Sequence, residues 1–456
     1  MLIGGPGDKR QPKKEERLVE DDAGQDIDQG LTLAEWLLLL VLAAVQFTHR
    51  MDFMIMMPLG PQCEDELGIS PQQFALVVSS YGFSAAISAL LAAFFIDRFD
   101  RRKTLLVLYG GLITGTFLCA IAPNYWSLIL ARTVAGAFGG VGGAFILVII
   151  GDSFSELRRG RATGVVMTAF SVASIAGLPT GILFGNQAGI GTPFAILGFL
   201  SLAIWLLAFK VLPPMRGHLG RSHLSLADTV AMIRQPAHLR AYSFMVVLVM
   251  GSFTIAPHFS DFLVRNVGRA KNDLIYVYFC GGLLTFVTLP LVGFCADRFG
   301  KRPVFLVMAG CTLVTILVLS NLPAAPLIPI LVVTTLYWIF TSGRWVPAMA
   351  LVTSSALPRY RGSFMSVNAS LQQTAIGLAA VVAGAVVGKA ESGEITGYTT
   401  AGIIAAASTG ISMLLIGRLR TAREIAESSV AVDSPADSPV FADAKHTKHV
   451  QAATPD

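Results

Sequence analysis

The chain has 456 residues, of which 54% are hydrophobic and only 14% are charged, and its mean hydropathy is +0.64. A soluble protein carries about a quarter of its residues as charged side chains, so an ordinary soluble enzyme and a nucleic-acid-binding protein are both excluded. The formal net charge of +5 reflects Lys and Arg residues in short loops between apolar segments, and we expect no nucleic-acid partner.

Apolar segments follow one another along the chain, and each is close to the roughly 20 residues that cross a bilayer. They do not alternate in the way that barrel strands do, and a bilayer otherwise accepts only helices. We therefore expect an all-α polytopic membrane protein in contact with the lipid bilayer. The twelve predicted transmembrane helices cover residues 33–61, 72–96, 104–122, 126–151, 162–185, 191–212, 241–264, 274–296, 303–321, 326–356, 362–388 and 396–417.

The predicted helices divide into two bundles of six. Residues 33–212 form the first bundle and residues 241–417 the second, joined by a cytoplasmic linker over 213–240. Residues 1–32 and 418–456 are polar, and we expect both to be disordered cytoplasmic tails. The first of these tails lacks the apolar core of a signal peptide.

Loop charge predicts the orientation. With the N-terminus inside, the inner loops hold sixteen Lys and Arg residues and the outer loops four, as the positive-inside rule requires. We expect a bacterial inner (plasma) membrane protein with both termini in the cytoplasm. The outer cluster of Arg265, Arg269 and Lys271 departs from the rule, and the sequence offers no physical account of it.

The chain also repeats itself at an offset of 200 residues. The run Asp97–Arg102 matches Asp297–Arg302, and Arg159-Gly160-Arg161 matches Arg359-Tyr360-Arg361. Two matches at one offset indicate duplication of a six-helix unit. Duplicated bundles with a binding site between them are typical of secondary transporters.

The repeated loop resembles the signature of the major facilitator superfamily, G-x-L-a-D-r-x-G-r-[RK]. The second copy reads GFCADRFGKR from Gly293, whereas the first departs from the pattern at Phe94 and Asp100. The resemblance covers residues 33–417 and implies a charge latch that joins the two bundles when the inner gate is shut, although plain positive-inside topology also explains such charges. The predicted gating residues are Asp97, Arg98, Arg101, Arg102, Asp297, Arg298, Lys301 and Arg302.

Helices 1 and 4 carry the candidates for proton coupling. Arg132 stands in a helix-4 stretch similar to the family pattern l-x-x-x-R-x-x-q-G, and Asp52 lies near the midplane of helix 1 at similar depth. A gate that makes and breaks an Asp52–Arg132 pair would bind and release a proton. His49 shares a helix face with Asp52 and is a second proton carrier. A static pair that fixes helix packing, with Arg132 reaching the interface, is the alternative.

Helix 5 contains Gly177, Pro179 and Gly181, which partly match the signature of drug:proton antiporters, G-x-x-x-G-P-x-x-G-G. Such a stretch predicts a helix bend, and it also suits close helix packing. Helix 1 ends in Pro58-Leu59-Gly60-Pro61, which resembles the same branch of the superfamily.

Polar and aromatic residues at mid-membrane depth are the candidates for a substrate cavity. Arg344 lies far from both ends of helix 10, and Trp338 and Trp345 share a face of that helix. The remaining candidates are Gln46 and Arg50 on helix 1. Because arginines outnumber acids at this depth, we expect an anionic, zwitterionic or amphipathic substrate. His258 and Asp261 on helix 7 are weaker candidates, because Asp261 lies close to the outer end.

These features predict a monomeric secondary transporter that moves a small amphipathic molecule by alternating access, with proton-coupled efflux as the favoured mode. The alternatives are a nutrient or organic-anion symporter, a lysolipid mover, a non-transporting sensor, an intramembrane enzyme and a pore. A sensor lacks an output domain here, an enzyme lacks a nucleophile–base pair or metal cluster, and ATP is excluded as the driver because no G-x-x-x-x-G-K-[ST] motif occurs. The five cysteines show no paired spacing, so we expect no disulfide, metal site or cofactor.

Overall fold

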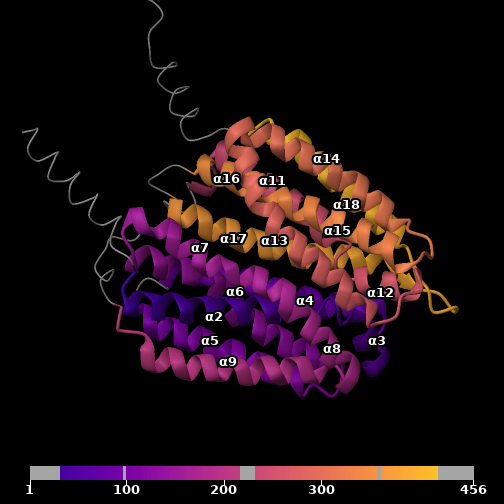
Figure 1. The fold of residues 1–456 in the computed structure, drawn as a ribbon, viewed down its shortest axis with the longest axis horizontal. Helices are drawn as coiled ribbons and strands as arrows, with labels where there is room; N and C mark the ends of the chain where they lie inside the picture. Colours follow the sequence, from indigo (N-terminus) through magenta and orange to yellow (C-terminus); the bar gives the residue numbers. More distant parts are fainter. Residues whose placement is uncertain (1–30, 96–98, 216–231, 357–360, 420–456) are drawn as a thin grey trace, which may run out of the picture.

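The computed structural model describes residues 31–95, 99–215, 232–356 and 361–419. The gating residues Asp97 and Arg98 therefore lie outside the described residues. Nearly all of both predicted tails and most of the predicted linker lie outside them as well. Two groups of roughly parallel helices face each other, with the first half of the chain on one side and the second half on the other (Figure 1).

The first half consists of helices and one π-helical segment. Its elements are α2 (Leu33–Met54), α3 (Gly60–Leu67), α4 (Pro71–Phe95), α5 (Arg101–Ala120), α6 (Tyr125–Ser153), α7 (Glu156–Val172), η2 (Ala173–Gly177), α8 (Leu178–Ala188) and α9 (Gly191–Val211). The π-helix η2 joins α7 to α8 without a loop.

The second half follows a similar plan, although some of its helices are divided at different places and a pair of short strands is added. Its elements are α11 (Pro236–Phe253), α12 (Phe259–Arg265), α13 (Asp273–Phe299), α14 (Lys301–Ser320), α15 (Leu327–Gly343), α16 (Trp345–Ser355), α17 (Arg361–Val386), β1 (Gly388–Lys389), β2 (Ile395–Thr396) and α18 (Tyr398–Ile416). The antiparallel pair of β1 and β2 is a short hairpin that the sequence analysis did not predict.

Eleven helical segments of the described chain are long and apolar enough to cross a membrane. The predicted count of twelve is therefore not reproduced in full. The difference falls at the predicted helix 241–264, which the structure divides into α11 and α12. The 18 residues of α11 include His238, Arg240 and Tyr242, and these polar side chains lower its hydropathy.

The first helix of each half is broken at the same place. Residues 55–59 separate α2 from α3, and residues 254–258 separate α11 from α12. Each break contains a proline, Pro58 or Pro257, which lacks a backbone N–H and cannot continue the hydrogen-bond ladder of a helix. The breaks leave two short helices, α3 and α12, at one end of the molecule.

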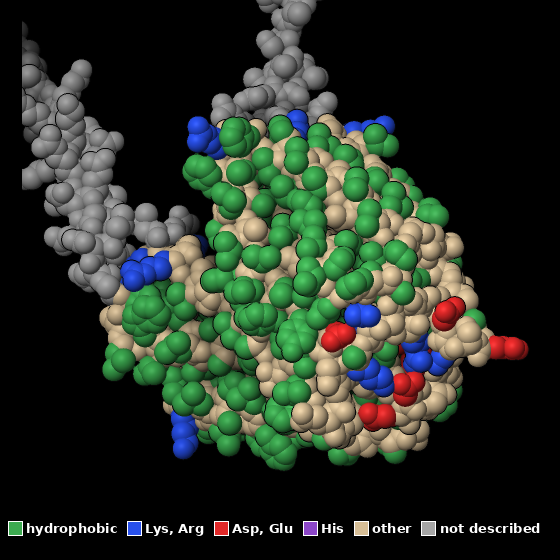
Figure 2. All heavy atoms as spheres, turned by 45° about the vertical axis from the view of Figure 1, so that its right-hand side comes forward, with side chains coloured by type: hydrophobic (Ala, Val, Ile, Leu, Met, Phe, Trp, Pro, Cys, Tyr) green, Lys and Arg blue, Asp and Glu red, His purple; other side chains and the backbone are tan. Residues whose placement is uncertain are grey.

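Two ends of the molecule are thereby distinguished. The hairpin end carries α3, α12, β1 and β2, and the opposite end is where the described chain begins and ends. The flank between them exposes large apolar side chains such as Phe199, Leu206 and Val307, and Figure 2 shows hydrophobic side chains spread over it. Such a flank suits contact with lipid.

The two halves meet most closely along α4 and α17. A Cβ on Gly82 would lie only 2.8 Å from the backbone nitrogen of Gly377, so the two helix backbones touch at this point. Further along the seam, Ser370 Oγ donates a hydrogen bond to the carbonyl of Ala86 at 2.8 Å. Small residues permit such close approach in membranes. On another side, Gly282 of α13 packs against the backbone of Ser174 in η2.

Candidate functional site

The first half encloses a buried ion pair. Arg132 Nη1 lies 3.2 Å from Asp52 Oδ2 and donates a second hydrogen bond, of 3.0 Å, to the Asp52 carbonyl oxygen. Asp52 lies near the end of α2 and Arg132 lies on α6, and both side chains are 1% exposed. The structure thus brings together the two residues that the sequence analysis paired for proton coupling.

The remaining contacts of the pair come from two other helices. Thr116 of α5 donates its hydroxyl to Asp52 Oδ1 at 2.8 Å. The Arg132 guanidinium stacks on the Tyr81 ring of α4, 4.4 Å from the ring centroid. A charged pair away from water is costly unless it is well surrounded, and here the carboxylate and the guanidinium each have two kinds of partner.

An aromatic path connects the pair to the other half. Tyr81 contacts Phe53, with ring centroids 5.5 Å apart, and Phe53 contacts Phe253 of α11 at 6.1 Å. Phe53 directly follows Asp52 in the chain, and Phe253 ends the helix before the break in the second half. Ring contacts thus connect the Asp52–Arg132 pair to the boundary between the halves.

His49, three residues before Asp52 on α2, forms a separate contact with α6. Its Nε2 is 2.6 Å from the carbonyl of Gly139 on α6, and since a carbonyl only accepts, this nitrogen carries the proton. His49 Nδ1 has no hydrogen-bond partner among the described residues. Gly143 leaves room for the His49 ring and lies beside the Arg50 guanidinium. Among the described residues, His49 thus retains an unbonded proton-accepting nitrogen inside the first half.

Arg344 is fully buried in the second half. It occupies the junction of α15 and α16 and donates hydrogen bonds to Ser252 Oγ at 2.7 Å and to Thr409 Oγ1 at 2.9 Å. Arg344 Nε has no hydrogen-bond partner among the described residues. Its contacts are hydroxyls rather than a carboxylate, so its charge is balanced by no ion pair in the described part of the chain.

The other predicted cavity residues are scattered. Gln46 is 1% exposed, and neither atom of its amide has a hydrogen-bond partner in the described ranges. Trp345 is partly buried and packs in the second half, near Val249. Trp338 packs on Gly281 of α13. The structure therefore does not gather all five predicted residues around one cavity.

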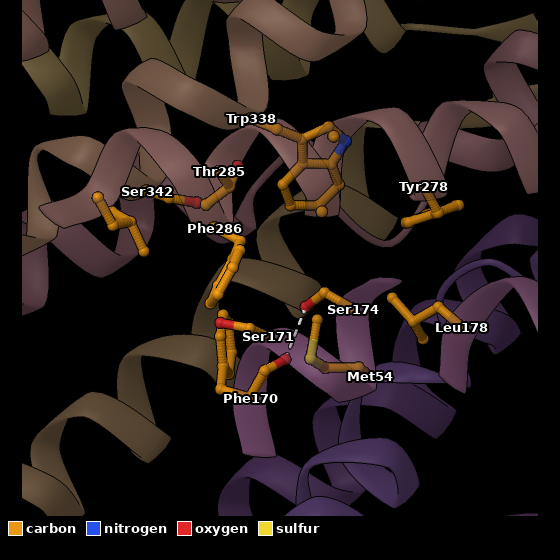
Figure 3. A pocket seen from close by; sticks show the side chains of 13 residues that line it. Met54, Phe170, Ser171, Ser174, Leu178, Tyr278, Thr285, Phe286, Trp338 and Ser342 are labelled. Carbon is orange, nitrogen blue, oxygen red and sulfur yellow. Dashed lines mark hydrogen bonds between the residues drawn. The ribbon is translucent and has the colours of Figure 1, made fainter. Parts of the chain in front are cut away.

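A small cavity of about 40 Å³ lies between the halves and is lined by Trp338. Figure 3 shows the Trp338 ring and Tyr278 of the second half facing Met54, Phe170 and Ser174 of the first. The lining is aromatic and aliphatic with several hydroxyls, and the cavity is much smaller than the roughly 300–1,000 Å³ of a typical ligand pocket.

The helix-5 glycines lie against helix 1. A Cβ on Gly177 would meet Met51 Sδ at 2.3 Å, and one on Gly181 would meet Ile55 Cδ1 at 2.3 Å. Pro179 stands in the first turn of α8, directly after the π-helical segment. The π-helical segment η2 ends at Gly177, and the glycines allow this helix to approach the residues that flank Asp52. The predicted bend stays a prediction.

The described gating residues contact their own half. Arg101 Nε lies 2.9 Å from Asp152 Oδ2 of α6, and Arg102 donates to the carbonyl of Phe209 on α9. In the second half, Arg302 donates to the carbonyl of Leu419. Asp297 and Arg298 are exposed. Within the described residues, the ion pairs at this end thus stay within one half.

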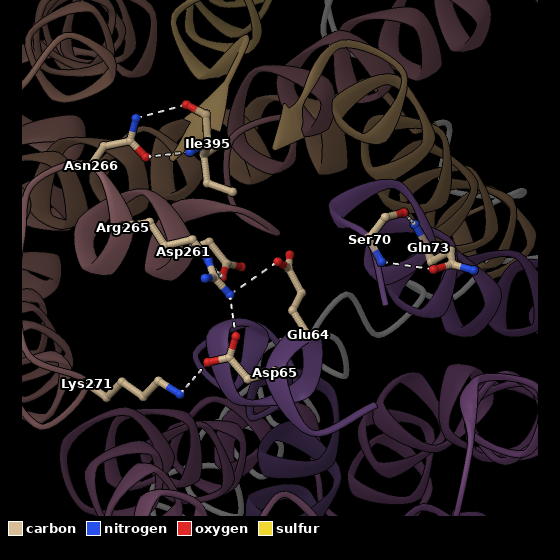
Figure 4. Close-up of polar contacts among 9 residues, drawn as sticks. All are labelled: Glu64, Asp65, Ser70, Gln73, Asp261, Arg265, Asn266, Lys271 and Ile395. Carbon is tan, nitrogen blue, oxygen red and sulfur yellow. Dashed lines mark hydrogen bonds and ion pairs between the residues drawn. The ribbon is translucent and has the colours of Figure 1, made fainter. Parts of the chain in front are cut away.

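At the hairpin end the ion pairs cross between halves (Figure 4). Arg265 of α12 lies 2.8 Å from Asp65 Oδ1 and 3.5 Å from Glu64 Oε2, both of α3. Lys271 lies 2.8 Å from Asp65 Oδ2, and Arg269 lies 4.0 Å from Asp273 within its own half. These contacts give the outer basic cluster a physical account: two of its three members hold the halves together.

The sequence analysis did not predict these ion pairs between the halves. It also did not predict that Glu64, His258 and Asp261 come together, with one ligand atom of each within 4.8 Å of the other two. A signal was nevertheless present. The acidic run Glu64-Asp65-Glu66 precedes Arg265 by about one repeat length of 200 residues, so the ends of equivalent helices carry opposite charge.

The chain resembles known proteins in sequence. Residues 42–264 and 241–450 match the Major Facilitator Superfamily profile. The chain is 25% identical over 390 residues to the uncharacterized MFS-type transporter YwfA of Bacillus subtilis (strain 168), covering 83% of this chain and 91% of YwfA. A probable sugar efflux transporter of Helicobacter pylori (strain G27) is 24% identical over 216 residues, covering 46% of this chain and 52% of that protein.

Solved structures share the fold. The crystal structure of a bacterial homolog of the human lysosomal transporter Spinster, in an inward-facing and unoccupied conformation, matches with a TM-score of 0.62 at 16% identity, covering 89% of this chain and 100% of the other. A peptide transporter in complex with alafosfalin matches with a TM-score of 0.65 at 15% identity, covering 84% and 94%. At such identities the likeness shows the fold alone.

Proposed function

This chain belongs to the major facilitator superfamily, and from that premise we propose that it is a proton-coupled secondary transporter that exports a small amphipathic molecule by alternating access. The observation that carries the proposal is the buried Asp52–Arg132 pair, joined through Tyr81 and Phe53 to Phe253 of the other half. Protonation of Asp52 weakens its attraction to Arg132 and so changes the packing between the halves.

The placement of ion pairs supports alternating access. Cross-half pairs hold the hairpin end closed, through Arg265 and Lys271 with Asp65. At the opposite end, the ion pairs of the described residues, such as that of Arg101 with Asp152, join residues of one half. The structure thus corresponds to a state closed at the hairpin end. Loop charge supports assigning that end to the outside and the termini to the cytoplasm.

Export of an amphipathic compound has separate support. The lining of the cavity around Trp338 is aromatic with interspersed hydroxyls, and one relative is named a probable sugar efflux transporter. An organic-anion symporter is the second candidate. It is favoured by Arg344, whose buried guanidinium is bound by hydroxyls only in the described chain and would attract an anionic group.

The test measures proton movement in inside-out vesicles while drugs, sugars, organic anions and lysolipids are added in turn. Wild type and Asp52→Asn are compared at matched expression. We expect one compound class to trigger proton release from the vesicles of wild type, and the variant to lose this response while it still exchanges the compound down its gradient. Uphill transport that is unchanged in Asp52→Asn would remove Asp52 as the coupling acid, and proton uptake with the compound would indicate symport.

A further inference from the structure

Three potential metal ligands meet where the two halves touch at the hairpin end. Glu64 belongs to α3 of the first half, whereas His258 and Asp261 come from the break before α12 and from α12 itself. One ligand atom of each residue lies within 4.8 Å of the other two. The group therefore exists only while α3 and α12 are adjacent.

All three side chains are buried and poorly bonded. Glu64 and Asp261 have 0% exposed side chains, and His258 is also 0% exposed. Both ring nitrogens of His258, both carboxylate oxygens of Asp261 and Glu64 Oε1 lack hydrogen-bond partners among the described residues. Buried polar atoms are nearly always bonded, so five such atoms in one place indicate a missing ligand.

The nearby cations lie closer to Asp65 than to Glu64 or Asp261. Arg265 and Lys271 each lie 2.8 Å from Asp65 at the surface, whereas Arg265 stays 3.5 Å from both Glu64 and Asp261. Burial raises the pKa of Glu64 to about 7, although Arg265 and Lys389 lower it.

We propose that Glu64, His258 and Asp261 bind a divalent transition-metal cation, with Zn²⁺ as the best match, and that the bound cation bridges the two halves. One imidazole nitrogen and two carboxylate oxygens form a donor set that suits such ions and leaves a fourth position for water. Bonds of about 2.0–2.2 Å require the side chains to turn inward slightly from their present separation. The gap in front of Asp261 is narrow, since a Cβ on Gly60 would meet its Oδ2 at 2.6 Å.

The site has a consequence for transport, which rests on the proposed function. A ligand that binds one state alone stabilises that state. Because the three ligands meet only when the hairpin end is closed, the cation holds that end closed and slows the transport cycle. External Zn²⁺ is then an inhibitor of transport.

The test uses the full chain, purified in detergent without an affinity tag and stripped with a chelator. ZnCl₂ is titrated while thermal unfolding and bound zinc are measured, so that the outcome does not depend on transport. We expect binding of one Zn²⁺ per chain with a rise in Tm. His258→Ala and Glu64→Gln should each weaken the apparent affinity about tenfold or more, and MgCl₂ should give no rise.

A matched control is available on the same helix. Glu66 is also a carboxylate of α3, but it accepts from the Ile190 backbone nitrogen within the first half, and Glu66→Gln should keep the full zinc response. Size-exclusion profiles confirm that each variant folds, and the two single variants serve as checks on each other. An equal zinc response in wild type, His258→Ala and Glu64→Gln, or no zinc binding to wild type, would overturn the site even if transport is observed.

Discussion

Arg265 contacts Glu64 and Asp65 across the boundary between the two halves, and it follows them by 201 and 200 residues, which is the offset of the internal repeat. The equivalent first helices of the two halves therefore end side by side with opposite charges. These opposite charges form a clasp that closes the hairpin end (Figure 4), made of Arg265 and Lys271 with Glu64 and Asp65.

Reversing one charge of this clasp should open the hairpin end, and reversing the partner charge as well should close it again. Arg265→Asp places a fourth acid beside Asp65 and Glu64, so repulsion replaces attraction. Each exposed pair contributes only about 0.2–1 kcal/mol. The free energies of the states with the hairpin end open and closed have to differ by little more, so a change of this size is enough to open that end. The measurement is the rate at which a membrane-impermeant maleimide labels Cys63, which is 0% exposed on α3. We expect the variant to react several-fold faster than wild type.

The control is the double variant Arg265→Asp with Asp65→Arg, which restores an ion pair with reversed polarity and should return Cys63 to slow labelling. Cys63→Ser provides the background from the other four cysteines. Labelling that stays slow in Arg265→Asp would show that the clasp does not hold the hairpin end closed.

Sequence patterning predicts most of this fold because a bilayer leaves few choices. Runs of about 20 apolar residues have to be helices, and a charge inside such a run needs a partner at the same depth. Asp52 and Arg132 could be paired on depth alone. The helix breaks at Pro58 and Pro257 are harder to predict, because a membrane helix can also tolerate a proline without a break.

The contacts between side chains of different helices depend on which helix faces meet. Helix length and hydropathy do not determine this. Arg344 reaches Ser252 and Thr409, whose ordinary hydroxyls gave no signal in the sequence. Glu64 and His258 stand 194 positions apart in the chain, and only the adjacency of α3 and α12 makes them neighbours. The count of twelve spans is not fully confirmed, because the first turns of α11 carry His238 and Arg240 and lower its hydropathy.

The α4–α17 seam should be sensitive to a single methyl group. In Gly82→Ala the new Cβ would lie 2.8 Å from the Gly377 nitrogen, so the helices have to separate. Overpacking of this kind costs about 1–3 kcal/mol, which exceeds the gain of about 1 kcal/mol from better helix propensity. We expect a lower Tm in detergent and slower transport.

The matched variant is Gly164→Ala on α7, where an added Cβ meets nothing within 4 Å. It should keep or raise the Tm, because it gains helix propensity without a clash. A drop of equal size in both variants would mean that the seam is not closely packed in the membrane protein.

Arg344→Ala should separate binding from folding. The two hydroxyls that Arg344 contacts keep their own acceptors, since Ser252 Oγ also donates to the Leu248 carbonyl at 3.2 Å and Thr409 Oγ1 to the Ala405 carbonyl at 2.8 Å. Removing the guanidinium therefore strands no hydroxyl proton, and we expect a loss of about 1–3 kcal/mol in stability at most.

If Arg344 binds an anionic group of the transported molecule, the same change should weaken the apparent affinity at least about tenfold, the equivalent of about 1.4 kcal/mol. The affinity is read from the compound concentration that gives half-maximal proton movement in vesicles, with Tm measured on the same preparation. Arg344→Lys keeps the charge and should recover part of the affinity, whereas Ser252→Ala removes one contact of the guanidinium and should change affinity little. Wild-type affinity in Arg344→Ala would assign this arginine to helix packing alone.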